Sequence, residues 1–179
     1  DNIDSTNEYI KLYISENRIC NGQVIITNYQ SKGKGQEGNK WESEPGKNLL
    51  FSIYLEDLRI NAEDQFLVSK AISLGICDYL NHRIQGFSVK WPNDIYYGNK
   101  KIAGILIENA IQSNKIKNSI IGIGINVNQN NFSESLPNPV SLNLITSNEY
   151  QIKEEIIILI DFLNKKLSKL EKDDHTDLN

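Results

Sequence analysis

The chain has 179 residues, of which 39% are hydrophobic and 23% charged, and its formal net charge is −4. This is the composition of an ordinary single globular domain, which argues against global disorder. The excess of acidic residues argues against a general nucleic-acid binder, since such proteins usually carry a net basic face. The sequence contains no signal peptide and no apolar run near the ~18–20 residues that span a bilayer, so we expect a cytoplasmic protein with neither a membrane nor a nucleic acid as partner.

Cysteines and histidines are few and scattered. Cys20 and Cys77 stand in unrelated contexts, and the only histidines are His82 and His175. No CxxC pair and no Cys/His metal spacing is present, so we expect no structural zinc site. We interpret the cysteines as free thiols of a reducing compartment and assign Cys77 and His82 to structure or surface.

The first third of the chain predicts one helix and two strands around a long loop. Residues 4–17 (DSTNEYIKLYISEN) open with side chains that can cap a helix and place apolar residues on one face. Residues 23–30 (QVIITNYQ) and 48–56 (NLLFSIYLE) are rich in β-branched and aromatic residues, which indicates strands. Residues 31–47 form a loop rich in glycine and lysine, and loops of such length are usually functional or disordered.

The middle of the chain predicts a helix followed by three strands. Residues 62–84 repeat apolar side chains at helical spacing, and such a helix should pack on the sheet. Residues 87–92 (FSVKWP) form a strand that ends at its proline, and residues 98–99 (GN) supply a hairpin turn. Residues 101–111 and 119–129 are two further strands, which we expect to be antiparallel neighbours.

The last part of the chain predicts a loop and a long helix. Residues 130–140 contain two prolines and form a loop, residues 152–172 form a strongly amphipathic helix, and residues 173–179 should be frayed. No internal repeat or linker divides the chain, so we expect one domain over residues 1–179. Hairpins predominate, which predicts an α+β fold with a mixed, largely antiparallel sheet and helices packed on one face.

Four segments are rich in polar, charged or glycine residues that a hydrophobic core does not need. They are residues 4–7 (DSTN), 30–41 (QSKGKGQEGNKW), 90–108 (KWPND followed by KKIAGILIE) and 122–128 (GIGINVN). The second contains glycines that let a backbone approach a ligand closely, together with lysines that suit an anion such as a nucleotide. It is not a Walker A loop, and a strand rather than a helix follows its GxGxxG spacing. The alternative interpretation is a flexible basic loop.

The third and fourth segments combine charge with exposed backbone. Asp94 ends one strand and Lys101 begins the next across a tight turn, so the ammonium should lie near the carboxylate. Gly104 permits close approach of a ligand to the sheet, and the alternate Gly122 and Gly124 leave a floor for a flat ligand. The alternatives are a solvated lysine at a strand edge and glycines that accommodate a crossing helix.

Together these motifs resemble the catalytic domain of the biotin protein ligase family, in its order and spacing and over nearly the whole chain. The resemblance implies a fold like that of biotin/lipoate ligases and class II aminoacyl-tRNA synthetases. It implies that biotin is activated with ATP to biotinyl-5′-AMP, with pyrophosphate as by-product. Biotin is then transferred to one lysine of a biotin carboxyl carrier domain. Members include monomers and homodimers, and we leave both open.

The resemblance also assigns residues to the site. Lys101 and Asp94 are the implied catalytic residues. Lys101 is implied to contact the biotin carboxylate and the α-phosphate. Asp94 is implied to position the acceptor lysine or to accept its proton. The implied biotin contacts are Ser5, Thr6, Asn7, Gln30, Gly33, Lys34, Lys101, Gly104, Gly122 and Gly124. The implied ATP and adenylate contacts are Lys34, Gly35, Gln36, Gly38, Trp41, Asn93 and Asn126. Mg²⁺ is expected with ATP, held mostly by phosphate and water rather than by protein ligands.

The chain departs from the family pattern in its loop and at its ends. Lys34 replaces an arginine, and Gln36 and Glu37 stand where a further arginine is usual. Lysine lacks the bidentate fork of arginine, so we expect weaker retention of the adenylate. Neither a helix-turn-helix module before Asp4 nor a small β domain after the last helix is found in these residues, so we expect no repressor function. A lipoate ligase and a non-catalytic domain that binds biotin or biotinyl-AMP are the alternatives.

Overall fold

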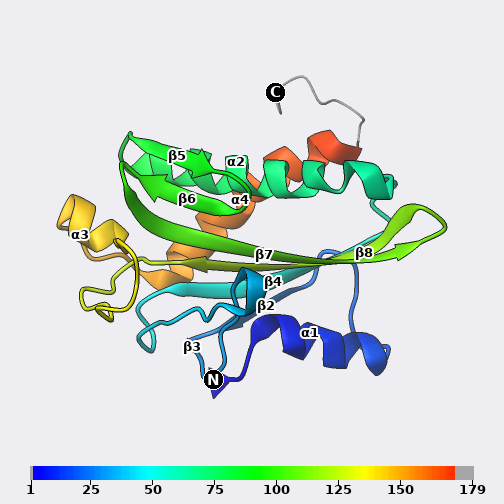
Figure 1. Cartoon of the computed structure of the whole chain (residues 1–179), viewed down its shortest axis with the longest axis horizontal. Coiled ribbons are helices and arrows are strands. Elements are labelled where there is room, and N and C mark those ends of the chain that lie inside the picture. The colour runs from blue at the N-terminus through cyan, green and yellow to red at the C-terminus, as the bar shows by residue number, and fades with distance from the viewer. Residues whose placement is uncertain (1, 172–179) are drawn as a thin grey trace.

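A six-stranded antiparallel sheet forms the centre of the protein in the computed structural model, which describes residues 2–171 (Figure 1). The strand order is β2-β4-β8-β7-β6-β5. β7 and β8 form a long hairpin, and β4 pairs with the other side of β8. The strand bounds are β2 Val24–Thr27, β4 Leu49–Glu56, β5 Phe87–Lys90, β6 Asp94–Tyr97, β7 Lys100–Gln112 and β8 Lys115–Ile125. The α+β class and the largely antiparallel sheet are therefore confirmed.

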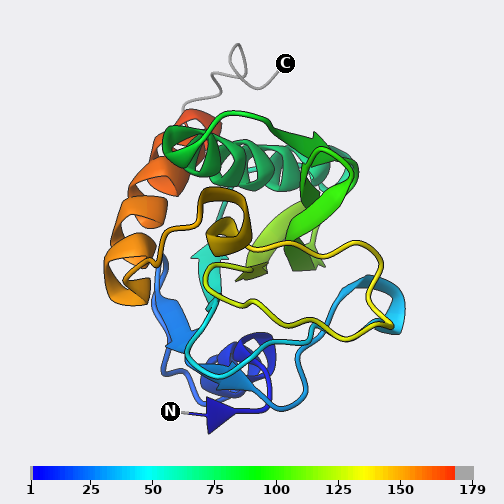
Figure 2. The ribbon, with the colours of Figure 1, turned by 90° about the vertical axis from the view of Figure 1, so that its left-hand side faces the viewer.

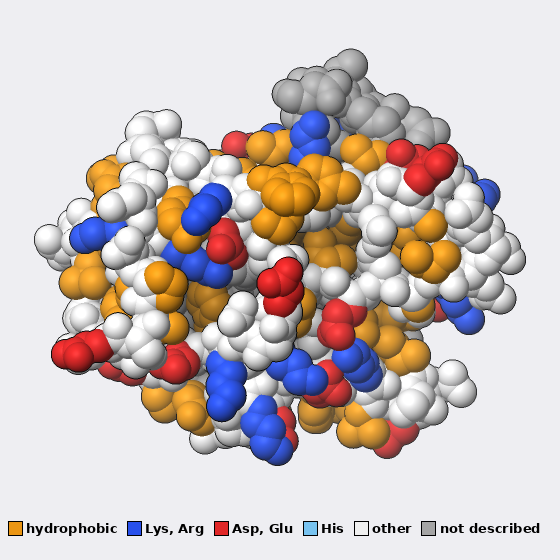
Figure 3. Space-filling model, viewed as in Figure 1, with side chains coloured by type: hydrophobic (Ala, Val, Ile, Leu, Met, Phe, Trp, Pro, Cys, Tyr) orange, Lys and Arg blue, Asp and Glu red, His pale blue; other side chains and the backbone are white. Residues whose placement is uncertain are grey.

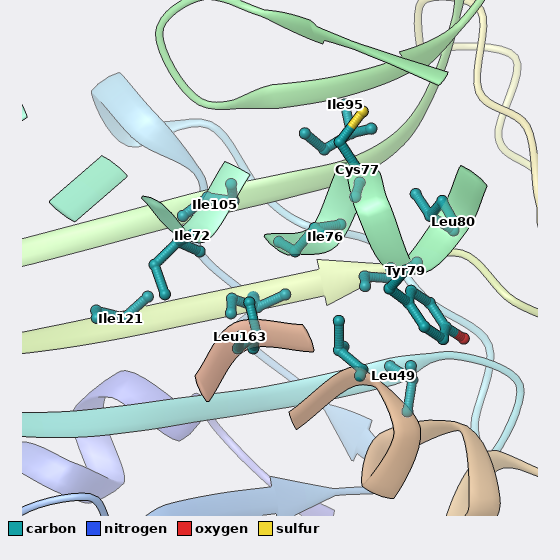
Figure 4. Close-up of a cluster of buried hydrophobic side chains, with 14 of the residues drawn as sticks. Leu49, Ile72, Ile76, Cys77, Tyr79, Leu80, Ile95, Ile105, Ile121 and Leu163 are labelled. Carbon is teal, nitrogen blue, oxygen red and sulfur yellow. The ribbon is translucent and has the colours of Figure 1, made fainter. Parts of the chain in front are cut away.

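The two long helices, α2 (Phe66–Arg83) and α4 (Ile152–Glu171), pack together on one face of this sheet (Figure 1). Their apolar side chains meet alternate residues of the central strands, which is what the period of two in a strand requires. Figure 4 shows this contact, with Ile72 and Ile76 of α2, Leu163 of α4 and Ile121 of β8 in one cluster. The main core of the molecule lies here.

Helix α1 (Thr6–Ser15) lies on the opposite face of the sheet (Figure 1). Its Ile10 packs with Tyr54 of β4 and Ile120 of β8 in a separate, smaller cluster. The expectation that helices cover one face thus holds for α2 and α4, whereas α1 covers part of the other. No other α-helix of the described residues 2–171 packs on that face.

Several boundaries differ from the sequence-based expectation. The strand expected over residues 23–30 is divided, because β3 (Tyr29–Gln30) leaves the main sheet and pairs in parallel with β1 (Asn2–Ile3). The strand expected over residues 87–92 ends at Lys90, a cis Trp91–Pro92 peptide follows, and β6 was not expected. The short helix α3 (Leu142–Thr146) was also missed, and residues 173–179, expected to be frayed, lie outside the described residues.

In the described part of the chain, no helix has both the length and the apolar character needed to cross a lipid bilayer.

Candidate functional site

A cavity of about 430 Å³ lies on the α1 side of the sheet and draws on all four of the unusual segments. It brings together most of the residues that the sequence singled out. Those that line it are Ser5, Thr6, Asn7, Gln30, Lys34, Gly35, Gln36, Trp41, Asn93, Asp94, Lys101, Gly104, Gly122 and Gly124. Gly33, Gly38 and Asn126 are not part of this lining. On the face drawn in Figure 3, acidic and basic side chains are interspersed rather than gathered into one charged patch.

One end of the cavity is built from uncharged polar groups at the start of α1. The backbone N–H of Thr6 donates to Oε1 of Gln30 at 2.8 Å, and the Thr6 hydroxyl oxygen lies 3.1 Å from the same atom. Ser5 occupies the N-cap position, but its side chain makes no capping hydrogen bond, so its hydroxyl is not engaged at the helix end. Ser5, Thr6 and Asn7 are each only 3% exposed. This end therefore offers buried donors and acceptors to a neutral polar ligand group.

The glycine floor predicted from the sequence exists, and side chains of the protein lie on it. A Cβ at Gly122 would overlap the carboxamide oxygen of Asn7. A Cβ at Gly104 or Gly124 would come within 2.9 Å of the Trp41 ring. The indole thus lies flat over the sheet at two of the three glycines, where only hydrogen atoms project.

The loop that carries Trp41 folds back on itself. The backbone N–H of Trp41 donates to the carbonyl of Gly33 at 3.0 Å, and Lys34 and Lys40 form an antiparallel β-bridge. A Cβ at Gly33 would overlap the carbonyl oxygen of Trp41, so glycine is needed there for the shape of the loop. Gly38 adopts a φ of +81° at the end of a short 3-10 helix, Gln36–Gly38, which also suits glycine.

Lys101 and Asp94 form an ion pair at 2.7 Å, which confirms that the ammonium lies near the carboxylate. Asp94 does not end the preceding strand as expected, because it begins β6, where it faces Gly104 of β7. Their side chains are 30% and 20% exposed, so the pair is partly shielded from water. The backbone of Lys101 is held by the loop before α3: its N–H donates to Asn138, and Val140 donates to its carbonyl. The ammonium lies 5.9 Å from the ring centroid of Trp41.

A second cavity, of about 360 Å³, adjoins the first. Trp41 and Lys101 line both cavities, so they stand at the boundary. The far wall is the loop over residues 132–139, and Figure 2 shows this yellow loop beside the light blue loop that carries Trp41. Asn126 lines this second cavity, together with Asn39 and Lys40.

Two residues that line the second cavity each have a buried polar atom without a hydrogen-bond partner among the described residues. These atoms are Oδ1 of Asn126 and Nε1 of Trp41, the latter against Gly124 of the glycine floor. Since buried polar groups are nearly always paired, such atoms suggest a bound group that satisfies them. Asn93 differs, because its Nδ2 donates to the carbonyl of Ile105 at 2.9 Å and so helps to hold β7.

Two lysines of the Gly-rich loop are paired with carboxylates at the start of the chain. Lys34 lies 2.7 Å from Glu8, and Lys32 lies 2.8 Å from Asp4. The hydrogen bond from Lys34, followed by one from Lys11, lowers the pKa of Glu8 below its ordinary value. The loop cation expected to meet an anionic ligand is thus neutralised by α1 in this structure.

Sequence reasoning missed several residues of the site and of its support. Asn39, Lys40 and Trp91 line the first cavity, and the loop over residues 132–139 lines the second. Ser52 lies behind the site and is fully buried. A serine in the middle of the apolar strand LLFSIYLE was the one available signal for it, whereas the loop residues carried no signal. Among residues 2–171, no three His, Cys, Asp or Glu side chains gather as a metal site.

Comparisons with known proteins give one consistent result. A model described as the biotin/lipoate A/B protein ligase family matches residues 1–126. The bifunctional ligase/repressor BirA of Escherichia coli is 34% identical over 139 residues, which are 76% of this chain and 42% of BirA. The biotin--protein ligase of Homo sapiens is 34% identical over 142 residues, 75% of this chain and 19% of that protein. The chain thus spans less than half the length of these relatives.

Solved structures agree with the sequence comparison. The biotin protein ligase from Aquifex aeolicus in complex with biotin and ATP aligns with a TM-score of 0.84 and 28% identity. The alignment covers 99% of this chain and 72% of that one. The biotin protein ligase of Leishmania major in complex with biotinyl-5-AMP aligns with a TM-score of 0.77 at 20% identity, which supports the fold alone.

Proposed function

The chain belongs to the biotin/lipoate A/B protein ligase family, and we propose that it activates biotin with ATP and then transfers the biotin to a lysine of another protein. Residues 1–179 would supply the catalytic domain for both steps. The acceptor that we propose is the carrier domain of a biotin-dependent carboxylase. A relative from Mycobacterium tuberculosis, 26% identical over 129 residues, bears the name biotin--[acetyl-CoA-carboxylase] ligase.

The observation that carries the proposal is the place of Lys101 between two cavities of different chemistry, with its ion-pair partner Asp94 in the wall of the first. The first cavity ends in neutral donors and acceptors, including Thr6 and Gln30, which suit a ureido ring. The second is lined by Trp41 and Asn126, whose unpaired polar atoms suit a nucleotide. Biotin extended along the first cavity would bring its carboxylate to Lys101, where the α-phosphate would also lie.

In the first step, a carboxylate oxygen of biotin attacks the α-phosphorus of ATP. The new bond gives biotinyl-5′-AMP, and the bond to the bridging oxygen breaks so that pyrophosphate leaves with its electron pair. The protein needs no nucleophile of its own, so its contribution is positioning and charge stabilisation. The Lys101 ammonium offsets the negative charge of the two groups that react.

In the second step, the amine of the acceptor lysine attacks the biotinyl carbonyl and AMP leaves. The amine must lose a proton, and we assign Asp94 to receive it or to orient the amine, because Asp94 lines the first cavity next to Lys101.

Mg²⁺ fits this site as an ion that ATP brings with it. The walls near Lys101 offer amide oxygens, among them the unpaired Oδ1 of Asn126, and no carboxylate cluster within the described residues. We therefore expect phosphate and water to supply most of the ligands. When bound, the ion would offset charge on the leaving pyrophosphate.

Biotin-dependent release of pyrophosphate from Mg-ATP tests this function, with lipoate as the rival acid and with no acid as the blank. Release that requires biotin is the expected result, and a carrier domain added afterwards should acquire biotin on one lysine. Release with lipoate instead would place the chain in the lipoate branch of its family. Binding of biotin with no release would indicate a binding domain and would contradict the proposal.

A further inference from the structure

The carboxylate of Glu108 lies behind the biotin end of the cavity and is shared between two partners. Its Oε2 accepts a hydrogen bond from Nδ2 of Asn7 at 2.8 Å. Its Oε1 accepts from the ammonium of Lys11 at 2.7 Å. Glu108 stands on β7 and the other two residues on α1, so the carboxylate joins the helix to the sheet.

Glu108 is the main group that sets the orientation of the Asn7 carboxamide, since its contact with Nδ2 at 2.8 Å is much shorter than that of the Leu106 carbonyl at 3.5 Å. An amide can exchange its oxygen and nitrogen positions by rotation, but an ionised carboxylate accepts hydrogen bonds only. The NH₂ group of Asn7 must therefore face Glu108. Its oxygen then faces Ser52, whose Oγ lies 2.6 Å away. The amide lies directly above Gly122, where a Cβ would displace it.

Ser52 extends this arrangement to the rest of the polar end. Its Oγ also lies 2.6 Å from the hydroxyl oxygen of Thr6. Because the single Ser52 proton is used for Asn7, the Thr6 hydroxyl is the donor in this contact, and the backbone N–H of Thr6 donates to Gln30 at 2.8 Å. Ser52 is 0% exposed. Hydrogen bonds thus run continuously from Gln30 through Thr6, Ser52 and Asn7 to Glu108.

Three members of this series line the cavity, namely Gln30, Thr6 and Asn7, whereas Ser52 and Glu108 do not. We propose that Ser52 and Glu108 are positioning residues for biotin recognition, which hold Thr6 and Asn7 in one hydrogen-bonding orientation before the ligand arrives. The proposal rests on the proposed function and names the residues that give that site its specificity. Preorganised groups bind more tightly because less ordering remains to be done on binding.

Glu108→Ala should raise the dissociation constant of biotin, measured by calorimetry without ATP, by about tenfold. The KM for ATP should change by less than about twofold, because the nucleotide end keeps its contacts. Glu108→Gln keeps an acceptor for Asn7 but can also present a donor, so it should recover only part of the affinity. Ser52→Ala should likewise raise the dissociation constant of biotin while leaving the KM for ATP nearly unchanged.

A double-mutant cycle separates positioning from a purely structural role. If Glu108 acts through Asn7, then Glu108→Ala should add little to the loss of biotin affinity caused by Asn7→Ala. Ser119→Ala is the matched control, because Ser119 is also fully buried in the sheet and its hydroxyl donates to Asn109 at 2.6 Å, away from the cavity. This control should leave the biotin affinity unchanged.

Additive losses of biotin affinity in the cycle would overturn the proposal. It would also be overturned if Glu108→Ala changed the dissociation constant of biotin and the KM for ATP by equal factors. An effect of Ser119→Ala as large as that of Ser52→Ala would also overturn it. Failure of the proposed function is distinguishable, since it would appear in the wild-type protein as no release of pyrophosphate with biotin, whereas the positioning roles are read from the biotin affinities of the variants.

Discussion

At the scale of single residues, the position of Trp41 depends on the glycines below it. A flat indole can lie on a sheet only where the strands present no side chains, and Gly104 and Gly124 meet that need. The ring also stands 5.9 Å from the Lys101 ammonium and between the two cavities. In the proposed function, this places an aromatic surface where adenine could stack once ATP is bound.

Gly124→Ala should displace the indole, because the new methyl group would lie within 2.8 Å of ring atoms. The chain has two tryptophans, so Trp91→Phe makes Trp41 the sole reporter. In that background, Gly124→Ala should shift the fluorescence emission to longer wavelength, since the ring moves toward water. In a Trp41→Phe background, where the 73% exposed Trp91 reports, the same substitution should cause no shift. Equal spectra in the first background would contradict the placement of Trp41.

At the scale of elements, the close contact of α2 and α4 depends on Gly75. A Cβ there would lie 2.9 Å from Cδ2 of Leu163 and 3.3 Å from its Cα. The second neighbour is backbone and cannot rotate away. The helices can therefore approach each other closely only if this position lacks a side chain.

Gly75→Ala should destabilise the protein, although alanine is the better helix former. The gain in helix propensity is about 1 kcal/mol, and overpacking of a buried contact costs about 1–3 kcal/mol, so we expect a net loss of up to about 2 kcal/mol. Urea unfolding measures it through the free energy of unfolding. Ser168→Ala on the exposed side of α4 serves as the control and should change stability by less than about 0.5 kcal/mol. An increase in stability for Gly75→Ala would contradict the described helix contact.

Local patterns predicted the elements that have strong periodicity or turn chemistry. The β7–β8 hairpin, β4 and the two long helices follow from their apolar spacing. The Gly98–Asn99 turn was predicted at the right place, but it joins β7 to the unexpected β6 rather than to the strand over residues 87–92. The pairing of β3 with β1 was not predictable, since Asn2 and Tyr29 meet only through tertiary contact. Helix α3 has five residues, too few to show a helical period.

At the scale of the whole molecule, a buried polar contact links the two long helices. The hydroxyl of Tyr79 donates to Glu155 at 2.6 Å, and Arg83 lies 2.8 Å from the same carboxylate. Tyr79 is 0% exposed. Burial, and secondly the hydrogen bond to Glu155, raises the pKa of the Tyr79 phenol above its ordinary value.

This shift predicts a loss of stability at alkaline pH. A raised pKa means that the folded state holds the proton more firmly than the unfolded state, so the contribution is complete below pH about 10 and falls above it. For one such phenol, the loss between pH 8 and pH 11 is about 1.4 kcal/mol. Urea unfolding at both pH values should show a smaller loss in Tyr79→Phe than in the wild type. Identical losses in the two proteins would contradict the assignment.

The composition of the site was largely predictable, and its arrangement was not. Lys101 and Asp94 could be paired from the sequence because a short hairpin joins them. The position of Trp41 on the glycine floor required the register of β4, β7 and β8, in which Leu50 faces Gly124 and Ser52 faces Gly122. The proposed roles of Glu108 and Ser52 were not predicted, because they arise from contacts between distant segments rather than from a motif.

The central claim is that biotin and ATP react at Lys101. The most direct measurement is the formation of biotinyl-5′-AMP from biotin and Mg-ATP, followed by mass spectrometry, in the wild type, Lys101→Ala and Lys100→Ala. Lys100 is the exposed neighbour outside both cavities and provides the matched loss of one positive charge. We expect Lys101→Ala to form the adenylate at least ~10²-fold more slowly, the usual scale for a preorganised charge, and Lys100→Ala to match the wild type. Equal rates in all three proteins would contradict the claim.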